Sequence, residues 1–368
     1  MKKISIFPLI LTALFLIALF LTPNPSVKGQ TIQGSIVINA DGTITPNNAS
    51  VPIKREGNTY FLTGDIYGSI TVECSNIAIF GNGFSLNLDM STLATERENW
   101  TGSIGLRLNH VNNVTITNTI ISDFHDVYFN GIAYEGWGIR LEASSNVKIY
   151  ENTIVGNGDG VKSSRSSNND IYCNSIINNS EVGISLYSSS NNNHIFNNSI
   201  DSNRYGIVLS SSQDNTINYN NIGNHKNRTD VGVREGVGIW ASFDAKHNHF
   251  YLNNLINNSR NALVSGTNAN SWDDGGFGNY WSDYQTKYPH ASSDKNGVAD
   301  TPYGVTIDGM DRTHAIPNYN IDHYPLAEPV SLDTPQAPVY VPEFSALIIL
   351  PLLLVALVAA IALRHQRT

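Results

Sequence analysis

The chain has 368 residues, a formal net charge of −9, and only 14% charged residues. Proteins that bind the phosphates of nucleic acids present a surplus of basic residues, so this composition excludes a nucleic-acid partner. The chain has two cysteines, Cys74 and Cys173. Whether they can pair depends on the architecture that the rest of the sequence predicts.

The N-terminus has the pattern of a secretory signal. Lys2 and Lys3 precede an apolar run over residues 4–21, and Pro23 and Pro25 follow it. A basic start followed by a short apolar run is typical of a cleaved signal peptide. We assign residues 1–29 to this peptide and expect the remaining chain to be exported.

Residues 30–78 read as short alternating strands, as in "NTYFLTGDIYGSITVEC", but lack the repeat described next. A stack of strands exposes an open edge at its end, and such an edge has to be covered. We therefore expect residues 30–78 to form an N-terminal β cap.

Residues 79–270 carry an internal repeat. A glycine followed by an apolar residue recurs 22, 23, 32 or 33 residues apart, at Gly105, Gly138, Gly160, Gly183, Gly206 and Gly238, with Asn261 in the same position once more. Such a period indicates a repeat architecture. Segments such as "GIRL", "NVKI" and "NTI" read as three short strands per repeat. Three strands make one turn of a parallel β-helix, whose interior no single repeat could bury alone.

Each repeat also carries an asparagine three residues after an apolar position, which gives the set Asn152, Asn174, Asn198, Asn220 and Asn253. Stacked asparagine side chains can form hydrogen bonds from turn to turn, so we predict a structural amide ladder. We place the serine runs at outer corners. Cys74 and Cys173 then lie at least three turns apart, roughly 14 Å. A disulfide needs Cα atoms within about 7 Å, so we predict free thiols.

One strand of each repeat directs a column of side chains outward that includes Arg107, Arg140, Lys162 and Trp240, and Tyr187 faces outward two residues further along its strand. Stacked cations repel one another. Either nearby carboxylates, Glu135, Glu142 and Asp159, neutralise the column, or it binds an anionic ligand. Two insertions, residues 122–137 and 223–237, occupy the same place in their repeats and could wall a groove. These residues favour a site for a polysaccharide or cell-wall glycan.

Residues 271–330 are rich in Trp and Asp and form an expected C-terminal cap. Its aromatic residues, Trp272, Tyr280, Trp281 and Tyr284, either plug the open end of the stack or form a sugar platform. Asp294, Asn296 and Asp300 alternate around Gly297, as oxygen ligands do in calcium loops. A solvated turn is the other interpretation. Sequons on expected outer turns predict glycosylation at Asn178, Asn197 and Asn257.

The chain ends with a linker over residues 331–343 and an uncharged apolar run over residues 344–363. The run is long enough to span a bilayer. Arg364 and Arg367 follow it, which predicts a cytoplasmic tail over residues 364–368. The sequence thus predicts a surface protein with one C-terminal transmembrane helix and its β-helix outside the cell.

The stacked "N-x-I-x-x-N-x-I…G-I-x-L" units resemble NosD-like repeats of the carbohydrate-binding and sugar-hydrolase type over residues 70–330. The segments "GNYWSDY", "DKNGVADTPYG" and "IDHYPL" are similar to the tails of archaeal surface proteins of this group. "VPEF" before the apolar run resembles an archaeal PEF-type sorting signal. The resemblance implies a right-handed parallel β-helix and an all-β fold.

The resemblance also implies copper handling, for which His247 and His249 are the best candidates. Copper sites use Met, Cys or clustered His, and the chain has only three methionines. A polysaccharide lyase, with Arg140 or Lys162 as base, is the enzymatic alternative suggested by the fold. No acidic pair recurs on adjacent turns, as glycoside hydrolysis would need. The residues favour glycan binding or a structural role over an enzyme, with no required cofactor.

Overall fold

The computed structural model describes residues 32–47, 50–88, 103–129, 132–226, 236–265, 268–308 and 320–332. All of the described residues belong to one compact unit. The expected signal peptide, linker, apolar C-terminal run and tail lie outside the described residues. Among the residues that are described, no helix is long and apolar enough to cross a membrane.

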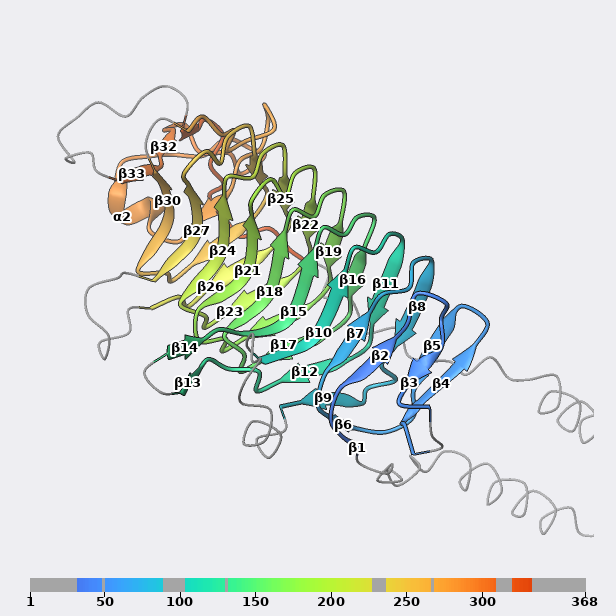
Figure 1. The fold of residues 1–368 in the computed structure, drawn as a ribbon. Coiled ribbons are helices and arrows are strands. Elements are labelled where there is room, and N and C mark those ends of the chain that lie inside the picture. Colours follow the sequence, from blue (N-terminus) through green and yellow to red (C-terminus); the bar gives the residue numbers. More distant parts are fainter. Residues whose placement is uncertain are drawn as a thin grey trace, which may run out of the picture. The chain divides into compact units, whose positions relative to one another are not determined.

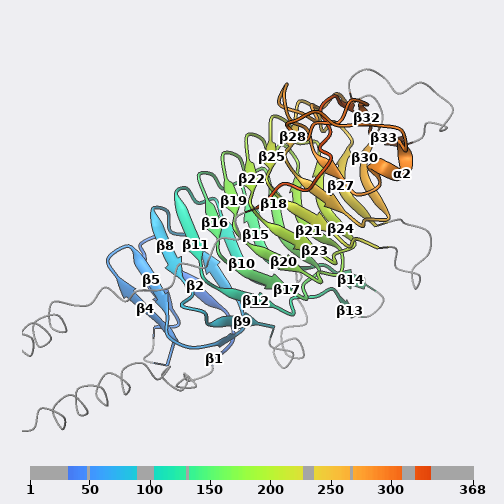
Figure 2. The same cartoon turned by 180° about the vertical axis from the view of Figure 1, so that it is seen from behind.

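Three large sheets form the stack in the described residues, and successive turns of the chain add strands to each of them (Figures 1 and 2). Sheet A has ten strands in the described residues, in the order β1 (Ile32–Gln33), β6 (Ile66–Tyr67), β9 (Ser85–Asn87), β12 (Ile120–Ser122), β17 (Thr153–Val155), β20 (Ser175–Ile177), β23 (Ser199–Asp201), β26 (Asn221–Gly223), β29 (Asn254–Ile256) and β31 (Tyr280–Trp281).

Sheet B has eleven described strands, in the order β3 (Ile44–Thr45), β2 (Ile36–Ile38), β7 (Ile70–Val72), β10 (Ser103–Asn109), β15 (Gly136–Glu142), β18 (Asp159–Ser164), β21 (Val182–Tyr187), β24 (Tyr205–Ser210), β27 (Val237–Ser242), β30 (Arg260–Ser265) and β33 (Thr306–Asp308). Sheet C has nine, in the order β28 (His249–Tyr251), β25 (Thr216–Asn218), β22 (His194–Phe196), β19 (Asp170–Tyr172), β16 (Lys148–Tyr150), β11 (Val114–Thr117), β8 (Ile77–Phe80), β5 (Thr59–Leu62) and β4 (Ile53–Glu56).

The stacking between consecutive turns is parallel, which confirms the predicted parallel β-helix. On sheet A, Ile154 pairs with Ile176, Ile176 with Ile200, and Ile200 with Ile222. All four isoleucines are fully buried. Because side chains alternate along a strand, each short strand sends one Ile inward and its neighbours outward. On these strands of sheet A, the interior is therefore a column of aliphatic side chains one residue wide.

An amide ladder runs along one corner of the interior through Asn152, Asn174, Asn198, Asn220 and Asn253. Each Nδ2 donates to the Oδ1 of the next asparagine at 3.0–3.1 Å, and the ladder continues from Asn253 to Asn279. The backbone N–H of each donates to the same oxygen. The ladder thus satisfies buried polar groups and fixes the register between turns.

Two further amide ladders occupy other corners, through Asn157, Asn179 and Asn203, and through Asn169, Asn193, Asn215, Asn248 and Asn270. The placement of the serine runs at outer corners is wrong in part. Ser144, Ser166, Ser190 and Ser212 are buried, and each hydroxyl oxygen from Ser166 onward accepts the backbone N–H of the preceding serine. Small hydroxyl side chains fit inside this tight turn, which the sequence pattern alone did not distinguish from an exposed one.

The parallel stacking begins earlier than residue 79. Strands β1 and β6, β2 and β7, and β5 and β8 are parallel pairs, so the segment predicted as a separate cap already supplies turns of the β-helix. Antiparallel pairing appears there only at β2–β3 and β4–β5 among the described strands. The first turns lack the Gly/Asn signature because their corners have different lengths, and the periodicity therefore missed them.

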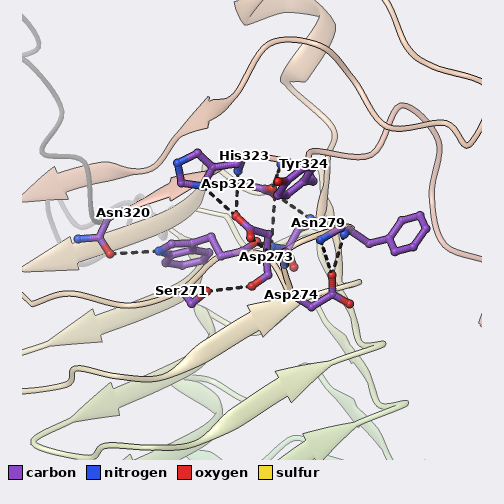
Figure 3. A network of polar contacts seen from close by, with 12 residues as sticks. Ser271, Asp273, Asp274, Asn279, Asn320, Asp322, His323 and Tyr324 are labelled. Atoms are coloured by element: carbon purple, nitrogen blue, oxygen red, sulfur yellow. Dashed lines mark hydrogen bonds and ion pairs between the residues drawn. The ribbon is translucent and has the colours of Figure 1, made fainter.

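The C-terminal end is closed by residues 268–308 and 320–332, which include the short helix α2 (Tyr284–Lys287) and the antiparallel pair β32 (Tyr303–Gly304) and β34 (Ile321–Asp322). Trp272 and Trp281 are fully buried, so they plug the stack and offer no sugar platform. Figure 3 shows the polar network at this end, which includes Asn279, Asn320 and Asp322. Asp322 accepts the Asn279 N–H at 2.7 Å and the Trp281 Nε1–H at 2.8 Å, and so terminates the first amide ladder.

Cys74 and Cys173 are free thiols, as predicted. Both are half-buried. Burial raises the pKa of the Cys173 thiol, and the nearby Glu151 carboxylate adds to the shift. A raised pKa lowers the fraction of thiolate, so Cys173 has the character of an unreactive structural cysteine.

Candidate functional site

The outward column predicted on the repeats lies on sheet B. Arg107 pairs with Arg140, and Arg140 with Lys162, on strands β10, β15 and β18. The same column continues through Ser185 and Val208 to Trp240. Three cationic residues therefore occupy directly opposite positions on three neighbouring turns, an arrangement that is unfavourable without compensating charge.

Carboxylates lie among these cations. Arg140 lies 3.2 Å from Glu142, which also forms an ion pair with Arg165. Lys162 Nζ lies 2.9 Å from Glu135 and 3.9 Å from Asp159. Burial, followed by the positive charge of Arg140, lowers the pKa of the Arg107 guanidinium. Of the two alternatives drawn from the sequence, the geometry favours local neutralisation for Arg140 and Lys162.

Trp137 underlies the charged part of this face. The Arg140 guanidinium lies 4.4 Å, and the Lys162 ammonium 4.9 Å, from the centroid of its ring. Lys162 also lies 5.2 Å from the centroid of Tyr187. Cation–π contacts of this kind hold long basic side chains flat against the sheet. The charged groups are thus positioned by neighbours on three turns.

Asp159 is the buried acid of the site and is 8% exposed. Burial raises its pKa to about 7, against the opposing effect of Lys162. Its carboxylate accepts hydrogen bonds from Ser185 Oγ and from the Val182 N–H, both at 3.2 Å. The Asp159 carboxyl group therefore changes its protonation state near neutral pH.

A second hydrophobic cluster lies on the outer side of sheet B, separate from the interior core. Its buried members are Val182, Tyr205, Val208, Val237 and Leu263, and the half-buried Tyr187 and Trp240 pack against it. The Tyr205 and Trp240 rings lie 5.5 Å apart, and Trp240 Nε1 donates to Ser265 Oγ at 3.1 Å. Burial raises the pKa of Tyr187 to about 12, so its hydroxyl keeps its proton.

Sequence analysis missed the apolar members of this outer cluster. The signal was present, because outward positions on four consecutive turns carry Val, Tyr or Leu where a solvent-facing strand is expected to be polar. Tyr187 and Trp240, which were predicted, belong to this cluster, whereas Arg107, Arg140 and Lys162 form the charged part beside it. We call the two parts together the sheet B face.

The first insertion contains an antiparallel hairpin of β13 (Val127–Phe129) and β14 (Ile132–Tyr134), which Figure 1 shows beside the stack. Asp126 accepts the Gly136 N–H at 2.7 Å and closes the base of this insertion next to Trp137. Most of the second insertion lies outside the described residues. The groove expected between the two insertions is therefore described on one side only.

The expected calcium ligands form a tight turn. Asp294 Oδ1 accepts the N–H groups of Asn296 at 2.8 Å and Val298 at 2.9 Å. Asp300 accepts the Ser292 hydroxyl at 2.6 Å, and this bond contributes most to lowering the pKa of Asp300. The carboxylate oxygens thus bond to the turn itself. Within the described parts of the chain, no three or more His, Cys, Asp or Glu side chains form a group that could hold a metal ion.

The residues also do not fit a copper site. His247 and His249 line one pocket of about 440 Å³ with His323. Among the described residues, however, they do not form a group of three or more side chains that could hold a metal ion. His194, two turns away on the same sheet, has its Nε2 at 2.9 Å from Asn218 Oδ1. No copper chemistry follows from this arrangement.

The three predicted glycosylation sites lie at corners of the stack with a positive φ of 53–55°. Asn178 and Asn257 are exposed, and Asn197 is half-buried. Asn257 Nδ2 donates to Asn224 Oδ1 at 2.8 Å, so a glycan there would replace a bond between turns.

The fold and its ladders define a parallel β-helix protein. Residues 24–286 match the family described as periplasmic copper-binding protein (NosD), and the chain belongs to this family. A search of curated proteins returns no match. Among solved structures, pectate lyase Pel9A is similar, with a TM-score of 0.38 and 12% identity over 62% of each chain.

Two other solved structures are similar to this chain. The periplasmic alginate epimerase AlgG aligns with a TM-score of 0.35 and 13% identity, over 68% of this chain and 83% of its own. The Dettilon tailspike protein aligns with a TM-score of 0.34 and 13% identity, over 68% of this chain and 58% of its own.

Proposed function

We propose that this protein binds a polysaccharide along the sheet B face and presents that face outside the cell. The supporting observation is the outer hydrophobic cluster with Tyr187 and Trp240, joined on neighbouring turns to the ionic cluster around Lys162. Aromatic rings offer apolar faces to sugar rings, and paired charged groups offer hydrogen bonds to hydroxyls. This combination is typical of a surface that holds carbohydrate.

The repeating geometry favours a polymer over a small ligand. Trp137 on β15 and Trp240 on β27 lie four turns apart, roughly 19 Å at the usual strand spacing. A chain of sugars that follows the solenoid axis would meet Arg140 and Lys162 first and the half-buried Tyr187 and Trp240 afterwards. Because Arg140 and Lys162 already have carboxylate partners, an acidic polymer has to compete with Glu142 and Glu135 for them.

A glycan array with residues 30–330 tests this proposal. The double variant Tyr187→Ala/Trp240→Ala should lose binding, and Arg107→Ser/Arg140→Ser/Lys162→Ser should lose any acidic glycans. Lys148→Ser, on the outer side of sheet C, is the matched control and should bind as the wild type does. The proposal fails if the wild type binds no glycan, or if both sheet B variants bind glycans as well as the wild type does.

The same experiment separates binding from catalysis. Any glycan that binds is incubated with the protein, and the ultraviolet absorbance of unsaturated products is followed. A rise in absorbance that Lys162→Ser abolishes would assign lyase chemistry to the site. A constant absorbance leaves a binding protein.

A further inference from the structure

The outer side of sheet C carries a stack of aromatic rings that the sheet B proposal does not use. The Tyr150 and Tyr172 rings lie 4.9 Å apart with an interplanar angle of 10°, and Tyr172 and Phe196 lie 4.8 Å apart with an angle of 6°. His194 stacks on Phe196 at 4.2 Å. Stacked rings cover one another's faces, so a ring face is available to a ligand only where the stack ends.

The stack ends at β25, where the residues in register with His194 and Phe196 are Thr216 and Asn218. The next strand, β28, restores large side chains with His249 and Tyr251. One layer of rings is therefore absent between β22 and β28, which lie two strand spacings apart, about 9.6 Å. The shorter side chains of Thr216 and Asn218 lie in this layer, and Asn218 Oδ1 is 2.9 Å from His194 Nε2.

A pocket of about 370 Å³ lies at this gap, lined by Asn192, Asn193, His194, Asp214, Thr216 and Tyr251. Asp214 is exposed, and its carboxylate lies 4.0 Å from His247 Nδ1. The pocket thus combines ring-bearing side chains with carboxylate, amide and hydroxyl groups. Ring stacking together with such hydrogen-bonding groups suits a sugar better than a purely aromatic ligand.

The second pocket, of about 440 Å³, lies on the adjoining turns. His247, His249, Asp273 and His323 line it, together with Ala269, Asn270, Ser271 and Ile321. His323 Nδ1 lies 3.1 Å from Asp273 Oδ2, so the C-terminal segment forms one side of this pocket (Figure 3). Because His249 is in register with Thr216, the two pockets follow one another along the sheet. We call them together the sheet C trough.

We propose that the sheet C trough binds a short neutral oligosaccharide, with one sugar ring seated between His194 and Tyr251. Neither lining contains Lys or Arg among the described residues, while Asp214 and Asp273 supply carboxylates. Carboxylates accept hydrogen bonds from sugar hydroxyls and repel uronic acids. The trough therefore selects neutral sugars, whereas the sheet B face also offers cationic partners.

The experiment titrates the full chain by calorimetry with cellotetraose, maltotetraose, mannotetraose and tetragalacturonate. At least one neutral tetrasaccharide should bind, and tetragalacturonate should not compete with it. Thr216→Phe places a ring in this pocket and should abolish this binding, while Asp214→Asn should weaken it about tenfold. Thr115→Phe is the control, because Thr115 occupies the same column of sheet C on an earlier turn.

Thermal melting shows that each variant folds before it is titrated. Arg107→Ser/Arg140→Ser/Lys162→Ser should leave this neutral binding unchanged, so failure of the sheet B proposal and failure of this one are scored separately. The proposal is overturned if none of the three neutral tetrasaccharides binds, or if Thr216→Phe binds as tightly as Thr115→Phe.

Discussion

His225 interrupts an amide ladder and makes a quantitative prediction. It follows Asn157, Asn179 and Asn203 in the second ladder, and its own N–H donates to Asn258 Oδ1 at 3.1 Å. The side chain is fully buried, with Nδ1 at 2.9 Å from the Asn203 carbonyl oxygen and Nε2 without a hydrogen-bond partner. An imidazole has no oxygen to accept the bonds that each asparagine amide directs to the next turn.

His225→Asn should therefore stabilise the protein. It restores a side-chain acceptor for Asn203 and removes a buried ring nitrogen without a partner. Leaving such a group unsatisfied costs about 1–3 kcal/mol, so the free energy of unfolding at pH 8 should rise by an amount in this range. If the larger imidazole is needed to fill this space, His225→Asn should instead lower the free energy of unfolding.

The pH dependence gives a second and independent signature. Burial lowers the pKa of His225 from 6.5 to about 4. The unfolded chain thus binds the proton more readily than the native protein between these values. The stability is fully present above pH 6.5 and is lost as the pH falls towards 4, by roughly 3 kcal/mol for a shift of this size. His225→Asn should remove this loss.

Urea unfolding of the wild type and the variant at pH 4–8 measures both effects. The difference between the two free energies of unfolding should grow as the pH falls from 6.5 to 4. His290→Asn, at an exposed position, is the control and should give a difference that does not vary in this way. A constant difference for His225→Asn across this range would refute the reasoning.

Three further predictions concern the ladder, its end and the thiols. Asn198→Leu leaves the Asn174 N–H without its acceptor and removes one of the acceptors of Asn174 Nδ2, and should lower the free energy of unfolding by about 2–4 kcal/mol in the same urea assay. Burial raises the pKa of Asp322 from 3.8 to about 7, so its ionisation reduces stability as the pH rises between these values. Asp322→Asn should flatten that part of the pH profile. Thiol titration of the unfolded protein without reductant should find Cys74 and Cys173 both free; a titre of zero would contradict their separation.

The sequence was sufficient for the fold because the repeat constrains every turn in the same way. Ile154, Ile176, Ile200 and Ile222 recur at one position, and only a parallel stack buries all of them together. The asparagine ladder followed from the same periodicity. The first turns were missed because β1, β2 and β5 keep the alternation of strands without the Gly/Asn corners. A sequence period reveals turns of the β-helix whose corners repeat, but it does not reveal turns whose corners differ.

The site was harder to predict because it depends on contacts between side chains on different turns. The sequence placed Arg140 and Lys162 in one outward column, but it could not decide whether Glu142 and Glu135 reach them. Nor did it indicate that Val208 would be buried on the outer side of sheet B. Such contacts depend on rotamers and on neighbouring insertions, and neither leaves a periodic signal in the chain.

The division between inward and outward positions also allows one scaffold to carry both of the glycan sites proposed above. Inward positions are fixed, because a change at Ile176 or Asn198 disturbs packing or hydrogen bonds on both neighbouring turns. Outward positions of the same strands have no such constraint. Asn218, in register with Phe196 and Tyr251, interrupts the aromatic stack on sheet C without altering the register of β25 with β22 and β28. Single substitutions at outward positions can therefore alter binding specificity. The interior stays unchanged and keeps the spacing between the residues that contact a polymer.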